Sequence, residues 1–175
     1  MARILIVYST TDGHTLRICE RLRGLLEAQG HQVSLVPVAE AADAGLEEYD
    51  RIVVGASVRY GKHRPAVVDF MNRNAALLNR KPSAFFSVNV VARKPGKNRP
   101  ETNPYVRKLL RTLAWRPAQV AVFAGKIDYP RYDFLDRMVI RFIMLLTGGP
   151  TDSKTVVEFT DWRQVEAFGG VIARM

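Results

Sequence analysis

Short apolar runs, separated by helical patterns, constrain the fold of this chain more than any other feature. Residues 3–8, 51–54, 83–91 and 120–124 are apolar almost throughout, and 32–38 alternates between apolar and polar. A strand that is apolar on both sides is typical of a parallel sheet between two layers of helices. The runs therefore predict an α/β fold with a doubly wound, five-stranded parallel sheet.

The segments between these runs show helical periodicity. Leucines recur on one face of 16–26 before Gly30 ends the pattern, and Pro65 stands where the next helix begins. The chain has 175 residues, of which 47% are hydrophobic and 25% charged, with no internal repeat. This composition predicts a single domain over residues 1–175.

Ligand sites in such sheets lie outside the carboxyl ends of the strands, where the strand order reverses. We therefore expect the loops after Tyr8, Gly55, Val88 and Ala124 to meet at one site. The first of these loops, 9–15, carries four hydroxyl residues and Gly13 but no lysine. A strand-to-helix loop of this kind presents backbone N–H groups and the positive end of a helix dipole.

The loop lacks the lysine of a P-loop and the glycine spacing of a dinucleotide fold. Neutral donors without a lysine favour a small terminal monophosphate. The simpler alternative is that Asp12 or Thr15 only caps the following helix.

Positive charge is concentrated in one segment. The chain carries a net charge of +9, and residues 91–116 hold eight basic side chains against the single acid Glu101. Such a segment favours an anionic partner, which is a nucleic acid, an acidic membrane surface or a small molecule with phosphate or carboxylate groups. We expect it to form a long basic insert after the fourth strand.

These segments carry a family resemblance. Residues 8–15, Tyr-Ser-Thr-Thr-Asp-Gly-His-Thr, resemble the FMN-phosphate loop of the flavodoxin family. The chain departs from that pattern at Cys19, where alanine is usual, and at Asp12, whose carboxylate would lie beside a phosphate. With 55–61, 83–95, 115–117, 129–132 and 160–162, the chain resembles the quinone-dependent protoporphyrinogen IX dehydrogenases, a flavodoxin-like family of haem biosynthesis. The chain departs from that family at Pro150, where the family pattern carries an acidic residue.

The resemblance implies FMN as the cofactor, with the loop on its phosphate, Tyr60 stacked on its ring and the segment after the fourth strand on the other side. The implied cofactor-binding residues are Ser9, Thr10, Thr11, Asp12, Gly13, His14, Thr15, Ser57, Tyr60, Gly61, Ser87, Val88, Asn89, Val90 and Ala92.

The resemblance also implies an oxidoreductase acting on CH–CH groups, which dehydrogenates protoporphyrinogen IX to protoporphyrin IX and passes electrons to a membrane quinone. It implies a peripheral protein on the cytoplasmic face of the inner membrane. Arg93, Lys94, Lys97 and Arg99 would contact the propionates of the substrate or an anionic membrane surface. The alternative for these four residues is a solvated charge run.

Residues 134–146 form a mostly apolar helical pattern that is too short to span a bilayer. Asp133, Arg137 and Arg141 mark a narrow polar stripe, so we expect the wide apolar face to pack on the sheet. The alternatives are an interfacial helix on a membrane and a patch covered by a second subunit in a homo-oligomer.

Other function classes remain as alternatives. A flavodoxin-type electron-transfer protein would share the fold, although such shuttles present an acidic face, and an NAD(P)H-dependent quinone or flavin reductase would need a nicotinamide site. Tyr105 and Trp115 within the basic segment suggest a nucleic-acid-binding module. Flavin absorbance in the purified protein would exclude that alternative. No catalytic acid–base pair is identified, and His14, His31 and His63 lack metal-ligand spacing, so we expect no metal.

Overall fold

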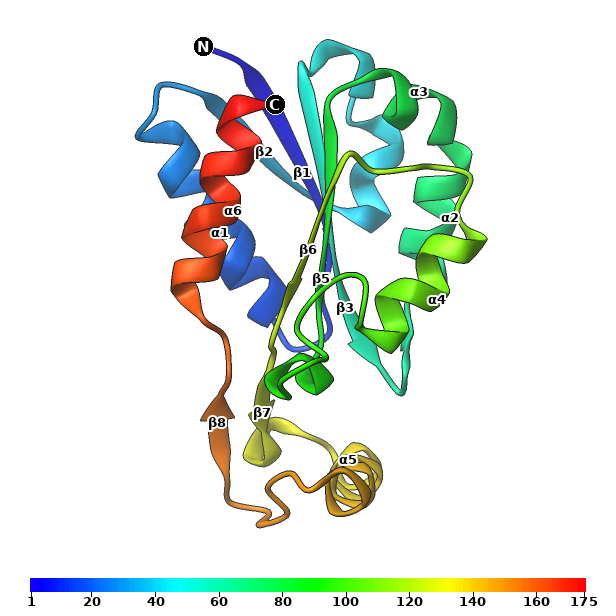
Figure 1. Ribbon diagram of the computed structural model, residues 1–175, viewed down its shortest axis with the longest axis vertical. Coiled ribbons are helices and arrows are strands. Elements are labelled where there is room, and N and C mark those ends of the chain that lie inside the picture. Colours follow the sequence, from blue (N-terminus) through cyan, green and yellow to red (C-terminus); the bar gives the residue numbers. More distant parts are fainter.

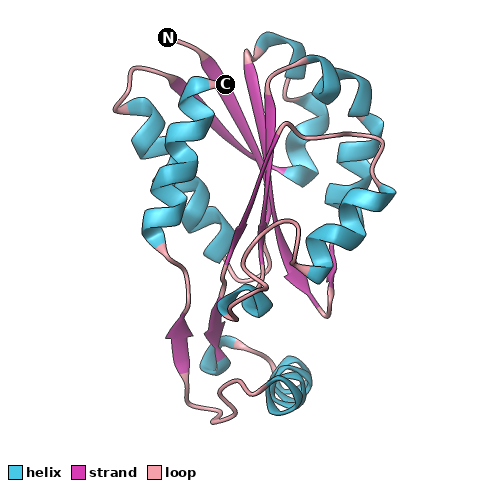
Figure 2. Cartoon of the chain, in the orientation of Figure 1, coloured by secondary structure: helices cyan, strands magenta, loops and turns pink.

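The computed structural model describes residues 1–175 and places five parallel strands in one sheet between two layers of helices (Figures 1 and 2). Their spatial order is β2-β1-β3-β5-β6, and the two-residue strand β4 pairs antiparallel with β3. The prediction of a doubly wound, five-stranded parallel sheet is confirmed. The strands of this sheet are β1 (Arg3–Ser9), β2 (Gln32–Pro37), β3 (Arg51–Arg59), β4 (Lys62–His63), β5 (Ser83–Val88) and β6 (Gln119–Phe123).

Two groups of helices cover the sheet. On one face lie α1 (His14–Glu27) and α6 (Trp162–Arg174), and on the other lie α2 (Pro65–Arg73), α3 (Ala75–Arg80) and α4 (Pro104–Thr112) (Figure 1). Short 3-10 segments occupy Val38–Asp43, Leu46–Glu48, Val90–Arg93 and Tyr129–Arg131.

The twofold alternation of strand side chains builds a core on each face. Leu5 and Val7 of β1 belong to the core under α2, α3 and α4, whereas Ile4 and Ile6 belong to the core under α1 and α6, and all four are fully buried. The indole N–H of the buried Trp115 donates to Ser83 Oγ at 3.0 Å, so the largest core side chain also satisfies its polar group.

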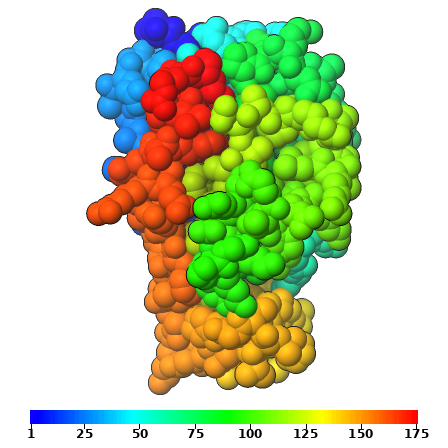
Figure 3. Space-filling model, viewed as in Figure 1, coloured from blue at the N-terminus to red at the C-terminus, as the bar shows by residue number.

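One excursion interrupts the doubly wound order between β6 and α6. It consists of β7 (Lys126–Asp128), α5 (Phe134–Thr147) and β8 (Val156–Glu158), with β7 and β8 paired antiparallel. Figure 3 shows this part, in gold and orange, at the end of the molecule to which the parallel strands point. A small core of Ile127, Tyr129, Tyr132 and Met144 holds it together.

The basic segment 91–116 follows β5, contains α4 and joins β5 to its neighbour β6, while the excursion lies at 126–158. One expectation needs correction. The expectation that helix 134–146 packs on the sheet is wrong. This helix, α5, lies beyond the edge of the sheet, and Met144 is its only buried residue (Figure 1).

Strand β3 continues through Gly55 to Arg59, beyond the end at Val54 that the sequence indicated. Gly55 pairs with Phe86 of β5, and a Cβ atom on Gly55 would lie 2.2 Å from the end of the Phe86 ring. The glycine is therefore needed for the close approach of that ring and does not end the strand.

We expect Gly55→Ala to lower the free energy of unfolding by about 1–3 kcal/mol, because Phe86 must leave its packed position. Gly24→Ala in α1 is the matched control, since its Cβ would meet nothing within 4 Å and alanine favours a helix by about 0.5–1 kcal/mol. Guanidinium unfolding of both variants measures the difference. Equal stability of the two variants would contradict this account of Gly55.

Candidate functional site

A cavity opens at the carboxyl edge of the sheet, where the loops after β1, β3, β5 and β6 meet. This is the place that the strand order predicted. Eleven of the predicted site residues line it: Thr10, Thr11, Asp12, His14, Thr15, Ser57, Tyr60, Gly61, Val88, Asn89 and Val90.

Four other predicted residues lie behind the cavity wall. Gly13 has a φ of 82° and its N–H donates to Thr10 Oγ1 at 3.0 Å, so it shapes the loop. Ser87 is fully buried beside His63, Ser9 ends β1, and the Ala92 N–H donates to Asn89 Oδ1 at 3.1 Å. These residues support the lining residues and do not face the cavity.

The four predicted cations after β5 also lie outside the lining. Arg93 donates to the carbonyl oxygens of Val90, at 3.1 Å, and of Thr147, at 3.2 Å, so it links the loop after β5 to the end of α5. Lys94 is half-buried, and Lys97 and Arg99 are exposed.

The sequence interpretation missed half of the lining. Gly125, Lys126 and Ile127 lie in the loop after Ala124, and Val58, Arg59 and Val91 follow Gly55 and Val88, so the strand order placed these segments at the site without indicating the individual residues. The other lining residues have no local signal, because only tertiary packing brings their segments to the cavity. They are Tyr105, Tyr132, Ile140, Ile143 and Met144.

Helix α1 begins at His14 directly against the cavity. No side chain caps this end, and its first turn holds no acid. The first N–H groups of an α-helix have no partner within the helix, so they are available to an anion.

Three buried side-chain atoms in the protein have no hydrogen-bond partner, namely Thr11 Oγ1, His14 Nδ1 and Ser57 Oγ, and all three residues line this cavity. Folded proteins almost always satisfy buried polar groups, so orphaned groups gathered at one place require an explanation. A polar ligand that reaches both the β1 loop and the end of β3 would satisfy them.

An aromatic ring stands at the rim of the cavity on a strained backbone. Tyr60 has a φ of 51°, the only positive value among the non-glycine residues, and Gly61 follows with 77°. Two consecutive left-handed residues make the tight turn between β3 and β4. The strained turn holds Tyr60 48% exposed at the rim of the cavity.

Arg59 connects three parts of the site. Its guanidinium lies 2.8 Å from Asp12 in the first loop and 3.5 Å from Asp136 in α5, and 5.1 Å from the centre of the Tyr132 ring. Burial raises the pKa of Asp12, while Arg59 acts in the opposite direction. Because Arg59 pairs with it, the Asp12 carboxylate is not an isolated negative charge in the loop after β1.

A chain of buried polar side chains runs behind the cavity. His63 Nε2 lies 2.8 Å from Ser87 Oγ, Asn89 donates to Ser87 Oγ at 3.2 Å, and Asn103 donates to Asn89 Oδ1 at 3.0 Å. Asn103 also donates to the Lys97 carbonyl at 2.9 Å. The chain therefore ties the basic loop to the cavity wall.

Comparison with known proteins identifies relatives over the whole chain. A family model described as a flavodoxin domain matches residues 5–154. Protoporphyrinogen IX dehydrogenase (quinone) of Escherichia coli K12 is 45% identical over 99% of this chain and 96% of its own length. The protein of the same name from Leishmania major is 41% identical over 99% of this chain and 75% of its own length.

Solved structures agree on the fold. A flavodoxin from the domain Archaea superposes with a TM-score of 0.56 at 18% identity, over 98% of this chain and 96% of that one. Oxidised flavodoxin 1 from Bacillus cereus superposes with a TM-score of 0.57 at 13% identity, over 98% of this chain and 97% of that one. At these identities the likeness concerns the fold alone.

Burial lowers the pKa of His63 from 6.5 to about 4, which predicts an acid-dependent loss of stability. Between these pH values the unfolded chain binds a proton that the folded chain excludes, so stability falls as the pH falls from 6.5 to 4. The contribution of His63 is about 3 kcal/mol over this window.

Guanidinium unfolding at pH 7.5 and at pH 4.5 should therefore show a smaller pH effect in His63→Gln than in the unchanged protein. His31→Gln is the comparison variant: burial also lowers the pKa of His31, but this side chain is only partly buried, so its substitution should remove less of the pH effect. An NMR titration of the unchanged protein in which the His63 ring protonates near pH 6.5 would refute the prediction.

Proposed function

The chain belongs to the flavodoxin-domain family and, within it, to the quinone-linked protoporphyrinogen IX dehydrogenases, and on that premise we propose that it uses FMN to dehydrogenate protoporphyrinogen IX, with a membrane quinone as the electron acceptor. The chemistry that bound FMN would supply is the uptake of hydrogen from the substrate and the transfer of its electrons to the quinone. The protein binds and orients these molecules and excludes water from the cavity.

The orphaned polar atoms of the cavity carry the assignment of FMN. Thr11 and His14 lie at the uncapped start of α1, where a phosphate is favoured, and Ser57 and Tyr60 lie at the end of β3, within reach of a ring system. Phosphate at one end and a stacked aromatic system at the other are the two features of a flavin mononucleotide. The residues present therefore fit the cofactor.

The other side of the cavity suits an apolar substrate. Ile140, Ile143 and Met144 of α5 line it opposite the loops, and Tyr105 lines it from the start of α4. A porphyrinogen presents a wide apolar macrocycle, and its burial against these side chains would be favourable.

The propionates of the substrate require cations at the edge of the cavity. No salt bridge of the protein involves any of the eight basic residues of 91–116. We assign carboxylate binding to Lys97 and Arg99, because Asn103 anchors their loop to the cavity wall.

We also propose that α5 rests on an anionic membrane surface. Nine large apolar side chains of the protein are exposed, and six of them belong to α5: Phe134, Leu135, Met138, Phe142, Leu145 and Leu146. No helix is long and apolar enough to cross a bilayer. An exposed apolar face on a short helix is suited to the interface of a membrane.

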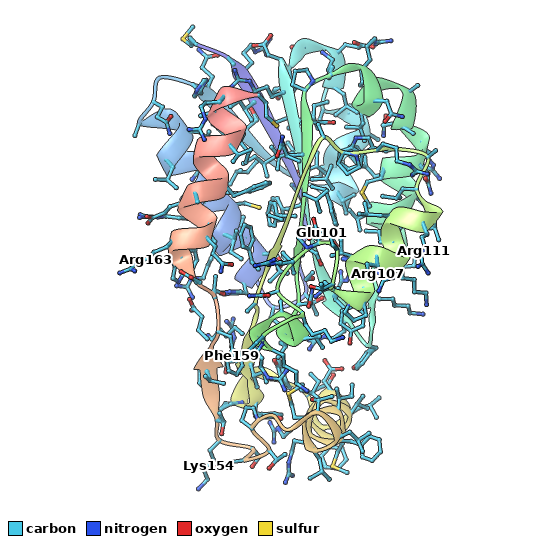
Figure 4. All side chains as sticks on the ribbon, in the orientation of Figure 1. Glu101, Arg107, Arg111, Lys154, Phe159 and Arg163 are labelled. Atoms are coloured by element: carbon cyan, nitrogen blue, oxygen red, sulfur yellow. The ribbon has the colours of Figure 1, made fainter.

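The placement of cations around α5 supports this orientation. Arg131, Arg141 and Lys154 are exposed near the helix, and Figure 4 shows Lys154 at the outer end of the molecule. The acids Asp133 and Asp152 each accept a hydrogen bond from a backbone N–H. A quinone held in the membrane would then approach the cavity along the wall that α5 provides.

Anaerobic mixing with protoporphyrinogen IX tests the enzymatic proposal. The FMN-loaded protein should lose its oxidised flavin absorbance on mixing, and a menaquinone analogue should restore it. Absence of flavin reduction would refute the dehydrogenase.

The same experiment tests the basic loop. Lys97→Glu combined with Arg99→Glu should require more substrate for half-maximal flavin reduction, and the effect should shrink as salt rises. Lys108→Glu with Arg111→Glu is the control of equal charge change, on α4, where Figure 4 shows Arg111 far from α5. Equal effects of the two pairs would assign the loss to overall charge and not to the loop.

Vesicle flotation tests the membrane proposal. Phe142→Ser and Leu145→Ser together should release the protein from anionic vesicles by tenfold or more, because each apolar side chain contributes about 1.5–3 kcal/mol when buried in lipid. FMN binding and thermal stability should be unchanged, since both side chains are exposed. Unchanged flotation, or a dimer in light scattering that these substitutions dissociate, would contradict a lipid-facing α5.

A further inference from the structure

The hydrogen bonds of His14 fix its tautomer. Thr160 Oγ1 lies 2.6 Å from the Ala124 carbonyl oxygen, to which it donates its only hydrogen. The same Oγ1 lies 2.6 Å from His14 Nε2, so it must accept there. The neutral His14 ring therefore carries its proton on Nε2 and a lone pair on Nδ1.

The lone pair on Nδ1 is an orphaned acceptor. The His14 side chain is 7% exposed, lines the cavity and finds no partner for Nδ1. Burial lowers the pKa of His14, so the ring is neutral near pH 7 when no ligand is present. A buried acceptor without a donor is unfavourable, and a protonated ring next to an anion would remove that cost.

The surroundings of His14 supply no free positive charge. Arg17 pairs with Glu158 at 3.1 Å, and Lys126 pairs with Asp128 at 2.9 Å. Arg17, Lys126 and Glu158 are the charged groups that act on His14, and the ring of Trp162 packs against it with centroids 6.1 Å apart. Across the loop, Arg59 pairs with Asp12 and Asp136.

A phosphomonoester is close to a dianion at neutral pH, with a second pKa near 6. In this loop it would meet the partial charge of the α1 N-terminus, whereas Arg131, which acts on Asp12 and forms no ion pair, is exposed to solvent. Arg17, Arg59 and Lys126 are already paired, so His14 is the buried group there that can acquire a charge without breaking an ion pair.

We infer that His14 Nδ1 binds the terminal phosphate of the cofactor and that one proton is taken up on binding and shared between that nitrogen and a phosphate oxygen. The proton comes from solvent, no covalent bond forms or breaks, and the complex carries one more proton than its free components at pH 8. The inference rests on the proposed use of FMN. It makes His14 the residue that distinguishes FMN from riboflavin.

Proton uptake is measured by titrating the FMN-free protein with FMN between pH 7 and pH 8.5. The dissociation constant should rise about tenfold per pH unit, and calorimetry in two buffers of different ionisation enthalpy should give uptake of about one proton at pH 8. Riboflavin, which lacks the phosphate, should bind with no pH dependence over this range. An FMN affinity that does not change with pH would overturn the inference.

Two variants locate the proton. His14→Asn keeps a side-chain donor but cannot titrate, so its FMN affinity should become independent of pH, whereas His31→Asn should keep the slope of the unchanged protein. A slope retained in His14→Asn would overturn the assignment. Nitrogen NMR of the unchanged protein provides the second measurement, because Nδ1 of His14 should change from the unprotonated to the protonated shift range when FMN is added.

The outcomes separate the two proposals. Failure of FMN to bind at any pH would refute the proposed function. Tight binding of FMN without proton uptake, or with an unprotonated His14 Nδ1 in the complex, would refute only the role of His14.

Discussion

Burial of the parallel sheet on both faces is the constraint on which the rest of this molecule depends. Side chains of β1 alternate between two closed cores, so neither face offers room for a ligand. Parallel strands bring all their carboxyl ends to one edge, and the uncapped start of α1 arrives there as well. Free backbone donors, orphaned hydroxyls and the only strained tyrosine therefore collect at the same place.

Two arginines fix the excursion to that edge. Arg59 binds Asp136 near the start of α5, and Arg93 bonds the Thr147 carbonyl at its end. A cation at the carbonyl end of a helix is favourable for the helix dipole as well as for the hydrogen bond. Because both ends are held, one side of α5 faces the cavity while its apolar outer side stays uncovered.

The sequence predicted what local physics determines. Apolar runs identified the strands, and their order placed the cavity, because both follow from residues adjacent in the chain. The hydroxyl-rich loop lines that cavity, and its contact with a phosphate stays a prediction. The position of α5 was predicted wrongly, since periodicity shows that a face is apolar but not what covers it. The bridge from Arg59 to Asp12 and Asp136 joins three distant segments, and no local pattern contains it.

Two groups of cations in this protein differ in whether a carboxylate pairs with them, and this difference would allow one chain to bind two kinds of anion. Around the cavity, Arg17, Arg59 and Lys126 are each neutralised by a carboxylate, so they contribute structure and little net field. The basic residues of 91–116 form no ion pair, so their field extends toward a carboxylate-bearing substrate or a lipid surface. A phosphate bound at α1, as we propose, would be compensated by the helix terminus and by His14, and its binding would not compete with the long-range attraction.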